Sequence, residues 1–260
     1  MAKTIPDLSK ARILICNDDG IQAKGIRLLF EMAKTLTDDV WVVAPEAEQS
    51  GASHSLTLRR PLRKRRFAEN WYAIDGTPTD CVLMGVTQIL ADRRPDLVMS
   101  GVNRGANLGE DVTYSGTVAG AREAVMLGIP AIAHSLIVAL NKPAKWETPQ
   151  KYGADLVRKL TTAGWTPNTI INVNYPDVPP EQVKGVEVAG LARRKLGTQW
   201  VEGVDPRGAP YYWLGMQRDE EVLDGTDLHA VMHGKISVTP VQLELVHPQS
   251  LDKLKSALGK

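Results

Sequence analysis

Cysteine is scarce in this sequence. Cys16 and Cys81 are the only two cysteines among 260 residues, and they do not have the spacing of zinc ligands. Two cysteines are too few for the disulfide framework that small secreted proteins use. The scarcity fits a reducing compartment, and we expect the protein to act in the cytoplasm.

Long apolar runs and an excess of charge of one sign are also missing. Residues 1–10 contain no apolar core of the kind that a secretory signal needs, and no later run approaches the ~20 apolar residues of a membrane-spanning helix. The formal net charge is only +1, from 31 Lys and Arg against 30 Asp and Glu. No global charge draws the chain to nucleic acid or anionic lipid, so we expect neither a stable nucleic-acid partner nor a membrane partner.

The sequence does contain a regular alternation of short β-branched runs and longer segments with helical spacing of apolar residues. The β-branched runs predict strands at residues 12–16, 40–44, 97–100, 131–135 and 169–173. The helical spacing predicts helices at residues 26–33, 78–90, 117–127 and 150–163. Because parallel strands need crossover connections that are usually helices, this order predicts an α/β protein with a Rossmann-like doubly wound, mainly parallel sheet.

The alternation stops near residue 183, where Gly, Pro, Trp and Tyr interrupt short apolar runs. Runs at residues 211–214 and 235–239 have the pattern of hairpin strands, and the apolar residues of the last ten positions share one face of a terminal helix. Such a face must pack on the chain itself or on a neighbouring subunit. We expect residues 1–260 to form a single domain, with a Rossmann-like core at about 1–180 and hairpin and C-terminal oligomerisation elements at about 181–260.

The end of the first predicted strand is the most informative segment. There an apolar run leads directly into Asn17, Asp18, Asp19 and Gly20. Ligands of open α/β sheets bind at the carboxyl ends of the strands, and two adjacent carboxylates at that place repel each other unless a cation or a proton intervenes. Their hard oxygen atoms suit Mg²⁺ or Mn²⁺. The same residue types are common in turns, so this segment by itself is equally compatible with a simple turn.

Two further polar loops follow predicted strands at the same end of the sheet. One, at residues 45–53, contains Ser50, and the other, at residues 100–109, contains Asn103 and Asn107 among several glycines. Glycine lets the backbone approach a ligand closely, and neutral Ser and Asn side chains supply polar atoms without adding negative charge. Both loops therefore strengthen the prediction of a cation site.

A third segment, Ser115, Gly116 and Thr117, opens the predicted helix at residues 117–127. The N-terminus of a helix that begins with such residues is suited to bind an anion, and a phosphate fits that description. The alternative is that Ser115 or Thr117 only caps the helix, which is the more common role of these residues.

Taken together, these segments resemble the survival protein E (SurE) family of metal-dependent nucleotide phosphatases. The resemblance covers most of the first half of the chain. Each motif is weak alone, whereas the combination is highly specific. The matching segments are residues 17–20, 43–45, 50–53, 76–81, 100–103, 107–109 and 114–117.

The resemblance implies a cofactor and a set of site residues. One divalent cation per subunit, Mg²⁺ or Mn²⁺, is expected to be held by Asp18, Asp19, Ser50 and Asn103. Asp18 and Asp19 are also the expected catalytic residues, with a water molecule activated by the cation as the attacking group and direct attack by an aspartate as the alternative. The expected contacts to phosphate come from Asn107, Ser115, Gly116 and Thr117.

The resemblance also implies the activity and the assembly. We expect hydrolysis of nucleoside 5′- and 3′-monophosphates, some action on short polyphosphate, and a homodimer or homotetramer with exchanged C-terminal elements. The alternative function is a metal-dependent nucleotide-binding sensor without turnover. A dinucleotide-dependent oxidoreductase is disfavoured, because no Gly-x-Gly-x-x-Gly follows the first strand.

Four other features admit more than one interpretation. The basic run at residues 59–66 has few aromatic residues around it and is most simply a solvated edge. Lys24 stands where many relatives carry proline and would meet substrate phosphate or face water. His54 would assist proton transfer or stabilise its loop. His229 and His233 have no acidic residue of the zinc-protease kind between them, which favours a structural or interface role.

Overall fold

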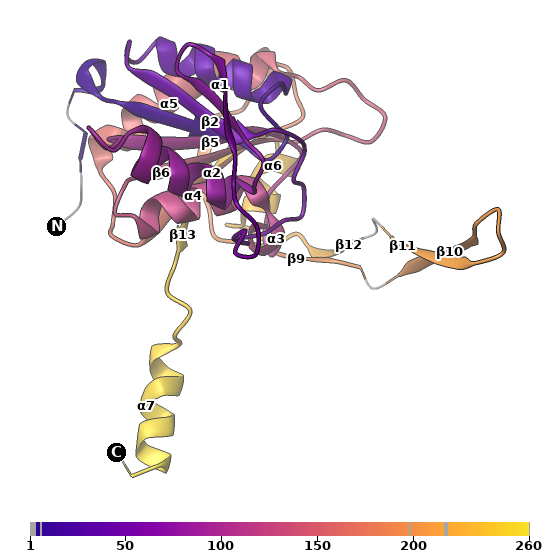
Figure 1. Cartoon of the computed structure of the whole chain (residues 1–260). Helices are drawn as coiled ribbons and strands as arrows, with labels where there is room; N and C mark the ends of the chain where they lie inside the picture. The colour runs from indigo at the N-terminus through magenta and orange to yellow at the C-terminus, as the bar shows by residue number, and fades with distance from the viewer. Residues whose placement is uncertain (1–3, 6, 198, 216–217, 260) are drawn as a thin grey trace.

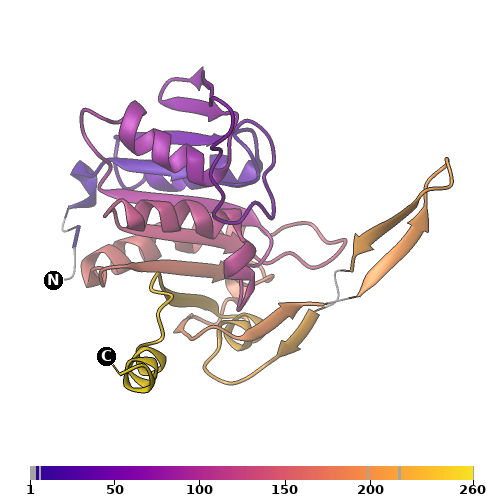
Figure 2. The ribbon, with the colours of Figure 1, turned by 60° about the horizontal axis from the view of Figure 1, so that its bottom comes forward.

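A computed structural model describes residues 4, 5, 7–197, 199–215 and 218–259. Its centre is a nine-stranded sheet in the order β3-β4-β2-β1-β5-β6-β7-β13-β8, with helices on both faces (Figures 1 and 2). The strands from β4 to β7 in this order are all parallel, whereas β3 and β13 run antiparallel to β4 and β7. The predicted α/β class with a mainly parallel, Rossmann-like sheet is confirmed.

The described elements have the following bounds. The strands of the main sheet are β1 (Ile13–Cys16), β2 (Val40–Pro45), β3 (Lys64–Ala68), β4 (Trp71–Ile74), β5 (Leu97–Arg104), β6 (Ala131–Leu136), β7 (Thr169–Tyr175), β8 (Val186–Val188) and β13 (Ile236–Gln242). The α-helices are α1 (Lys24–Lys34), α2 (Pro78–Met84), α3 (Asp111–Tyr114), α4 (Gly116–Met126), α5 (Glu147–Ala163), α6 (Asp227–Met232) and α7 (Pro248–Ala257). Short helical turns are η1 (Leu8–Lys10), η2 (Gly85–Ile89) and η3 (Pro180–Gln182). Within these described ranges, no helix has both the length and the apolarity needed to cross a lipid bilayer.

Strand β1 is apolar at every position because both of its faces are covered. In β1, Ile13 and Ile15 belong to the core beneath α1 and α5, while Leu14 and Cys16 belong to the core beneath α2 and α4. A parallel strand between two helical layers has no solvent-facing side, so it reads as a continuous apolar run. This burial explains why the strand was recognisable from its sequence alone.

The expectation that residues 235–239 form a hairpin strand is wrong. The strand found there, β13, lies inside the main sheet, antiparallel to β7 and parallel to β8. Residues Ile236 to Thr239 are all buried, and a short strand-like segment does not reveal in its sequence which strand it will pair with. The segment after residue 180 thus contributes two strands to the main sheet, and the assignment of residues 1–260 to a single domain stays a prediction.

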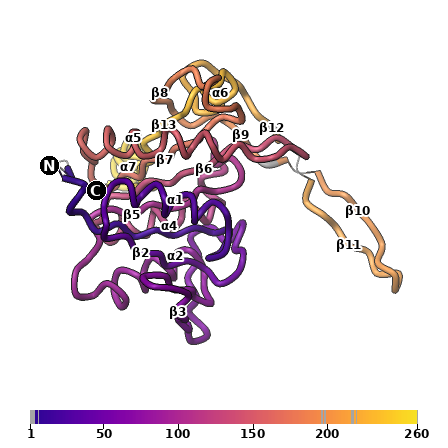
Figure 3. The backbone as a smooth tube through the Cα atoms, turned by 90° about the horizontal axis from the view of Figure 1, so that it is seen from above, coloured from indigo at the N-terminus to yellow at the C-terminus, as the bar shows by residue number. Residues whose placement is uncertain are grey.

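The predicted hairpin at residues 211–214 is confirmed, and it belongs to a long arm. Strands β9 (Arg193–Leu196) and β12 (Arg218–Glu221) form the base of the arm, and β10 (Trp200–Val204) and β11 (Pro210–Leu214) form its distal hairpin. The arm extends away from the body of the molecule (Figures 1 and 3). Its distal hairpin exposes the large apolar side chains of Trp200, Val201, Val204, Tyr211, Tyr212, Trp213 and Leu214.

The terminal helix α7 also stands apart from the sheet (Figure 1). None of its described residues is buried, and Leu251, Leu254 and Leu258 are 43%, 59% and 75% exposed. The apolar face predicted from the sequence is therefore present, and the chain's own body does not cover it.

The basic run at residues 59–66 leads into β3, which forms one edge of the main sheet. All five residues of β3 are exposed. Arg60 pairs with Asp75 at 3.2 Å and Arg65 pairs with Glu46 at 2.6 Å. The interpretation of this run as a solvated edge agrees with the structure.

Candidate functional site

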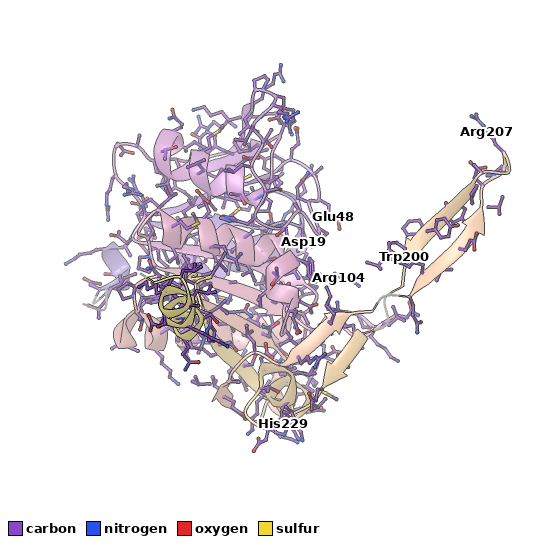
Figure 4. All side chains as sticks on the ribbon, turned by 90° about the horizontal axis from the view of Figure 1, so that it is seen from below. Asp19, Glu48, Arg104, Trp200, Arg207 and His229 are labelled. Atoms are coloured by element: carbon purple, nitrogen blue, oxygen red, sulfur yellow. The ribbon has the colours of Figure 1, made fainter. Side chains whose placement is uncertain are left out.

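A cavity of about 650 Å³ lies at the carboxyl ends of β1, β2 and β5. Asp18, Asp19, Ser50 and Asn103, which the sequence places up to 85 positions apart, all line it. Figure 4 shows Asp19, Glu48 and Arg104 together at the edge of the body that faces the base of the arm. The fold thus brings the four predicted metal ligands to one place.

Asp18 is the buried member of the acidic pair, with 4% of its surface exposed. Burial raises the pKa of its carboxyl to about 6, and the charge of Asp19 acts in the same direction, while a hydrogen bond from Thr117 opposes both. That bond runs from the Thr117 hydroxyl to Oδ1 of Asp18. Ionising both Asp18 and Asp19 is therefore unfavourable unless a positive charge lies next to them.

Gly116 completes the support beneath Asp18. A Cβ atom on Gly116 would lie 2.7 Å from Cβ of Asp18, so a residue with a side chain would displace the carboxylate. Neither Gly116 nor Thr117 lines the cavity, although both were predicted to contact phosphate. The structure places them behind Asp18, where they position it.

Asp19 is more accessible and its Oδ2 accepts the backbone N–H of Arg104 at 3.3 Å. Burial raises the pKa of Asp19, the Arg104 N–H lowers it, and the nearby charge of Glu48 raises it. Glu48 also accepts a hydrogen bond from the Ser50 hydroxyl at 2.8 Å. Glu48 was not predicted from the sequence, because glutamate in a polar loop has no distinguishing pattern and Glu46 lies in the same loop.

The loop that carries Ser50 is tied to the rest of the site at several points. The N–H of Gln49 donates to the carbonyl of Asp18 at 2.8 Å, and the Ser53 hydroxyl donates to the carbonyl of Thr113 at 2.8 Å. Farther along, His54 Nε2 lies 2.9 Å from Glu123 Oε2 on α4. Of the two roles considered for His54, the structure supports loop stabilisation. Lys24, also left open, lies over the ring of Trp146 at 5.8 Å and does not line the cavity.

The segment expected to be a loop from Ser100 onward is in fact strand as far as Arg104. Pairing with β6 is irregular between Ser100 and Asn103, and this irregularity brings Asn103 to the cavity. Gly101, with φ of 127°, passes so close to the His134 carbonyl that a Cβ atom would collide with it. Glycine is required there, which is why the segment looked like a loop in the sequence.

Asn107 is held by polar side chains that rise from the sheet itself. Its N–H donates to Asn174 Oδ1 at 2.9 Å, and its carbonyl accepts from Asn172 and Asn174 at 2.8 Å and 3.0 Å. Its own amide donates to the Ser135 hydroxyl at 2.7 Å. These supporting residues were missed, and the available signal was asparagine in strands that are otherwise apolar.

Ser115 lines the cavity and is also the N-cap of α4, where its Oγ accepts the Val118 N–H at 3.0 Å. The capping role considered from the sequence is confirmed. A contact between Ser115 and phosphate stays a prediction.

A hard divalent cation fits this set of donors. Carboxylate, hydroxyl and carboxamide oxygens are the ligands that Mg²⁺ and Mn²⁺ prefer. Burial, with a smaller contribution from the charge of Asp19, raises the pKa of Asp18, and a cation beside the two carboxylates favours their charged forms. The chemistry of the residues therefore agrees with the cation expected from the resemblance.

A second group of potential ligands lies elsewhere in the molecule. Ligand atoms of Glu187, Asp224 and His229 all fall within 4.8 Å of one another, but none of these residues lines the cavity, and His229 lies well away from Asp19 in Figure 4. Glu187 already pairs with the Lys235 ammonium at 2.7 Å. The rings of His229 and His233 lie 4.1 Å apart, in keeping with the structural role favoured above.

Comparison with known proteins identifies the family of this chain. The sequence profile of a family described as Survival protein SurE matches residues 13–198. The chain belongs to this family. It is 53% identical to the "5′-nucleotidase SurE" of Paramagnetospirillum magneticum, covering 97% of this chain and 98% of the relative. It is 46% identical to the protein of the same name from Rhodospirillum rubrum, covering 99% of this chain and all of the relative.

The SurE fold is also found by structural comparison. The crystal structure of the SurE protein from Aquifex aeolicus superimposes with a TM-score of 0.82 at 40% sequence identity, covering 95% of this chain and 99% of that protein. The similarity in fold therefore extends over nearly the whole chain.

Replacing Thr117 with Val is expected to weaken cation binding by about tenfold to a hundredfold, because an outer residue that orients a metal ligand typically contributes that much. Valine keeps the shape of threonine and removes only the hydroxyl that donates to Asp18. Titration calorimetry with Mn²⁺ measures the effect. Thr117→Ser keeps the hydroxyl and serves as the control, and equal affinity in all three proteins would show that the hydrogen bond is unimportant.

Proposed function

We propose that this protein is a metal-dependent phosphomonoesterase that hydrolyses nucleoside 5′-monophosphates to nucleoside and phosphate. The observation that carries the proposal is the convergence of Asp18, Asp19, Ser50 and Asn103 on one cavity. The relatives named 5′-nucleotidase SurE, which match nearly the whole chain, support the choice of substrate. Hydrolysis of 3′-monophosphates and of short polyphosphate belongs to the same proposal.

Each site residue has a part in this proposal. The four converging side chains hold one Mg²⁺ or Mn²⁺ per subunit, which when bound supplies Lewis acidity toward the phosphoryl oxygens. Asp19 is the more accessible carboxylate and is the better placed of the pair to accept a proton from the attacking water. Asn107 and Ser115, which line the same cavity, orient the phosphate.

Assembly and location are further parts of the proposal. The distal hairpin of the arm and α7 expose several large apolar side chains close to one another in the sequence, and grouped apolar exposure of this kind marks interaction surfaces. Their exposure supports a homodimer or homotetramer in which both elements pack against other subunits. We place the enzyme in the cytoplasm, without a stable nucleic-acid partner.

The test is phosphate release from a panel of nucleoside 5′- and 3′-monophosphates and tripolyphosphate, with Mg²⁺, with Mn²⁺ and with EDTA. We expect release that requires the cation and returns when the cation is restored after EDTA. Nucleotide binding that depends on the cation but releases no phosphate would instead make the protein a sensor.

A further inference from the structure

The cavity is larger than one phosphate group needs. Its volume of about 650 Å³ lies within the range of cavities that enclose a whole small molecule. The carboxylates of Asp18, Asp19 and Glu48 stand at the end formed by the loops after β1 and β2. If the scissile phosphate lies beside these residues, the rest of the substrate must lie along another part of the wall.

That other part of the wall is built from α3 and from the base of the arm. Tyr114 comes from α3, and Arg218 comes from β12, 200 positions after Asp18 in the sequence. Lys195 of β9 lies over the Tyr114 ring at 4.5 Å and donates to its hydroxyl, which fixes the arm against α3. The arm is therefore part of the active-site wall as well as an exposed extension.

Arg218 is fixed in place but keeps donors for a ligand. Its Nη1 donates to Oδ1 of Asp111, and its side chain is 23% exposed. A guanidinium carries five N–H groups in one plane, and within the described part of the chain the hydrogen bond to Asp111 uses one of them. A planar cation held at one corner is well suited to stack on an aromatic base or to donate to ribose and base oxygens.

Arg194 provides a natural comparison within the same cluster. Its Nη1 donates to Oδ2 of Asp111, so one carboxylate holds both arginines. Arg194 does not line the active-site cavity and instead lines a separate one with Glu220 and Leu228. The two arginines therefore share a structural partner, and they differ in their access to the substrate.

We propose that Arg218 is a specificity-determining residue that contacts the nucleoside part of the substrate. The inference rests on the proposed nucleotidase function and adds to it a residue from the arm. The nucleoside then lies between Tyr114 and Arg218, and its phosphate lies beside Asp18 and Asp19. Small phosphate esters that do not extend to Arg218 gain nothing from this contact.

The experiment compares nucleoside 5′-monophosphates with para-nitrophenyl phosphate in the full-length enzyme with Mn²⁺. For Arg218→Gln we expect KM for AMP, GMP, CMP and UMP to rise about tenfold to a hundredfold, since a hydrogen bond from a charged group contributes about that much to binding. We expect kcat for the nucleotides, and both constants for para-nitrophenyl phosphate, to change by less than about threefold. Arg218→Lys keeps the charge and loses the planar arrangement of donors, so we expect its KM for nucleotides to lie between those of the wild type and of Arg218→Gln.

Two further variants separate substrate contact from structural support. Arg194→Gln removes the other ion pair of Asp111, and it should change KM and kcat by the same factor for nucleotides and for para-nitrophenyl phosphate. Arg207→Gln, at the tip of the arm, should behave as the wild type (Figure 4). Inhibition of para-nitrophenyl phosphate hydrolysis by free adenosine and by inorganic phosphate provides a second measurement. The inhibition constant for adenosine should rise in Arg218→Gln, and that for phosphate should not.

The outcomes distinguish failure of this inference from failure of the proposed function. Equal effects of Arg218→Gln and Arg194→Gln on nucleotides and para-nitrophenyl phosphate would overturn the inference, because Arg218 would then act only through Asp111. If the wild type hydrolysed para-nitrophenyl phosphate but no nucleotide, the proposed function would be wrong. The adenosine inhibition constants would still decide whether Arg218 binds a nucleoside. If the wild type hydrolysed neither ester, both proposals would fall.

Discussion

Replacing Asp18 with Asn is expected to abolish phosphate release while the fold is retained. Asparagine has the size of aspartate and its Oδ1 can still accept the Thr117 hydroxyl, but it brings no negative charge to the cation. A catalytic cation contributes several kcal/mol to transition-state stabilisation, so the rate should fall by on the order of a thousandfold or more. Phosphate release from AMP at saturating Mn²⁺ measures the loss, and circular dichroism checks the fold.

Asp38→Asn is the matched control for this experiment. Asp38 is fully exposed and does not line the cavity, and among the residues that the structure describes its one ion pair is with Lys34, four residues earlier, at 3.3 Å. Its variant should keep wild-type activity. An Asp18→Asn enzyme with normal turnover would remove the acidic pair from the proposed site.

The same Asp18→Asn variant is expected to be more stable than the wild type when no cation is present. Folding raises the pKa of Asp18 from 3.8 to about 6, so the folded protein holds this proton more tightly than the unfolded chain. The stability that the neutral carboxyl contributes is complete below pH 3.8 and is lost as the pH rises through 6. At pH 7.5 in EDTA the free energy of unfolding should therefore be higher in the variant, by up to about 3 kcal/mol.

Urea unfolding at two pH values tests the sign of this effect. The advantage of the variant should shrink to about 1 kcal/mol at pH 4.5, where the folded wild type keeps the Asp18 proton. Adding Mn²⁺ at pH 7.5 should stabilise the wild type and leave the variant nearly unchanged, because binding to the folded state alone raises stability. A variant less stable than the wild type in EDTA at pH 7.5 would show that burial does not penalise the Asp18 charge. Function and stability are expected to oppose each other at this residue.

Elements with strong local patterns were predictable from the sequence. The strand expected at residues 12–16 is β1, and the helix expected at residues 117–127 is α4, which begins one residue earlier. A buried parallel strand, or an amphipathic or buried helix, can be recognised from the spacing of its own apolar residues. The Asp18 and Asp19 pair was recognisable for the same reason, since it follows directly on such a strand.

Elements that depend on partners distant in the sequence were less predictable. The pairing of β13 with β7 and β8 was missed, and so was the strand character of residues 101–104. In both cases the residues have a local pattern compatible with several structures. Pairing with strands distant in the sequence decided which structure formed. The register and the neighbouring strand depend on which face of the strand must be buried in the core.

The sequence by itself determined the α/β class and the position of Asp18 and Asp19 after the first strand. The roles of Ser50 and Asn103 as cation ligands came from the family resemblance and stay a prediction. The tertiary structure alone decided that Thr117 supports Asp18 and that Arg218 joins the cavity wall. A motif is visible in a sequence when its residues are adjacent and share one local geometry. The hydrogen bond from Thr117 to Asp18 joins residues 99 positions apart, and the one from Arg218 to Asp111 joins residues 107 positions apart. Only the folded sheet and the docked arm bring these residues within reach of one another.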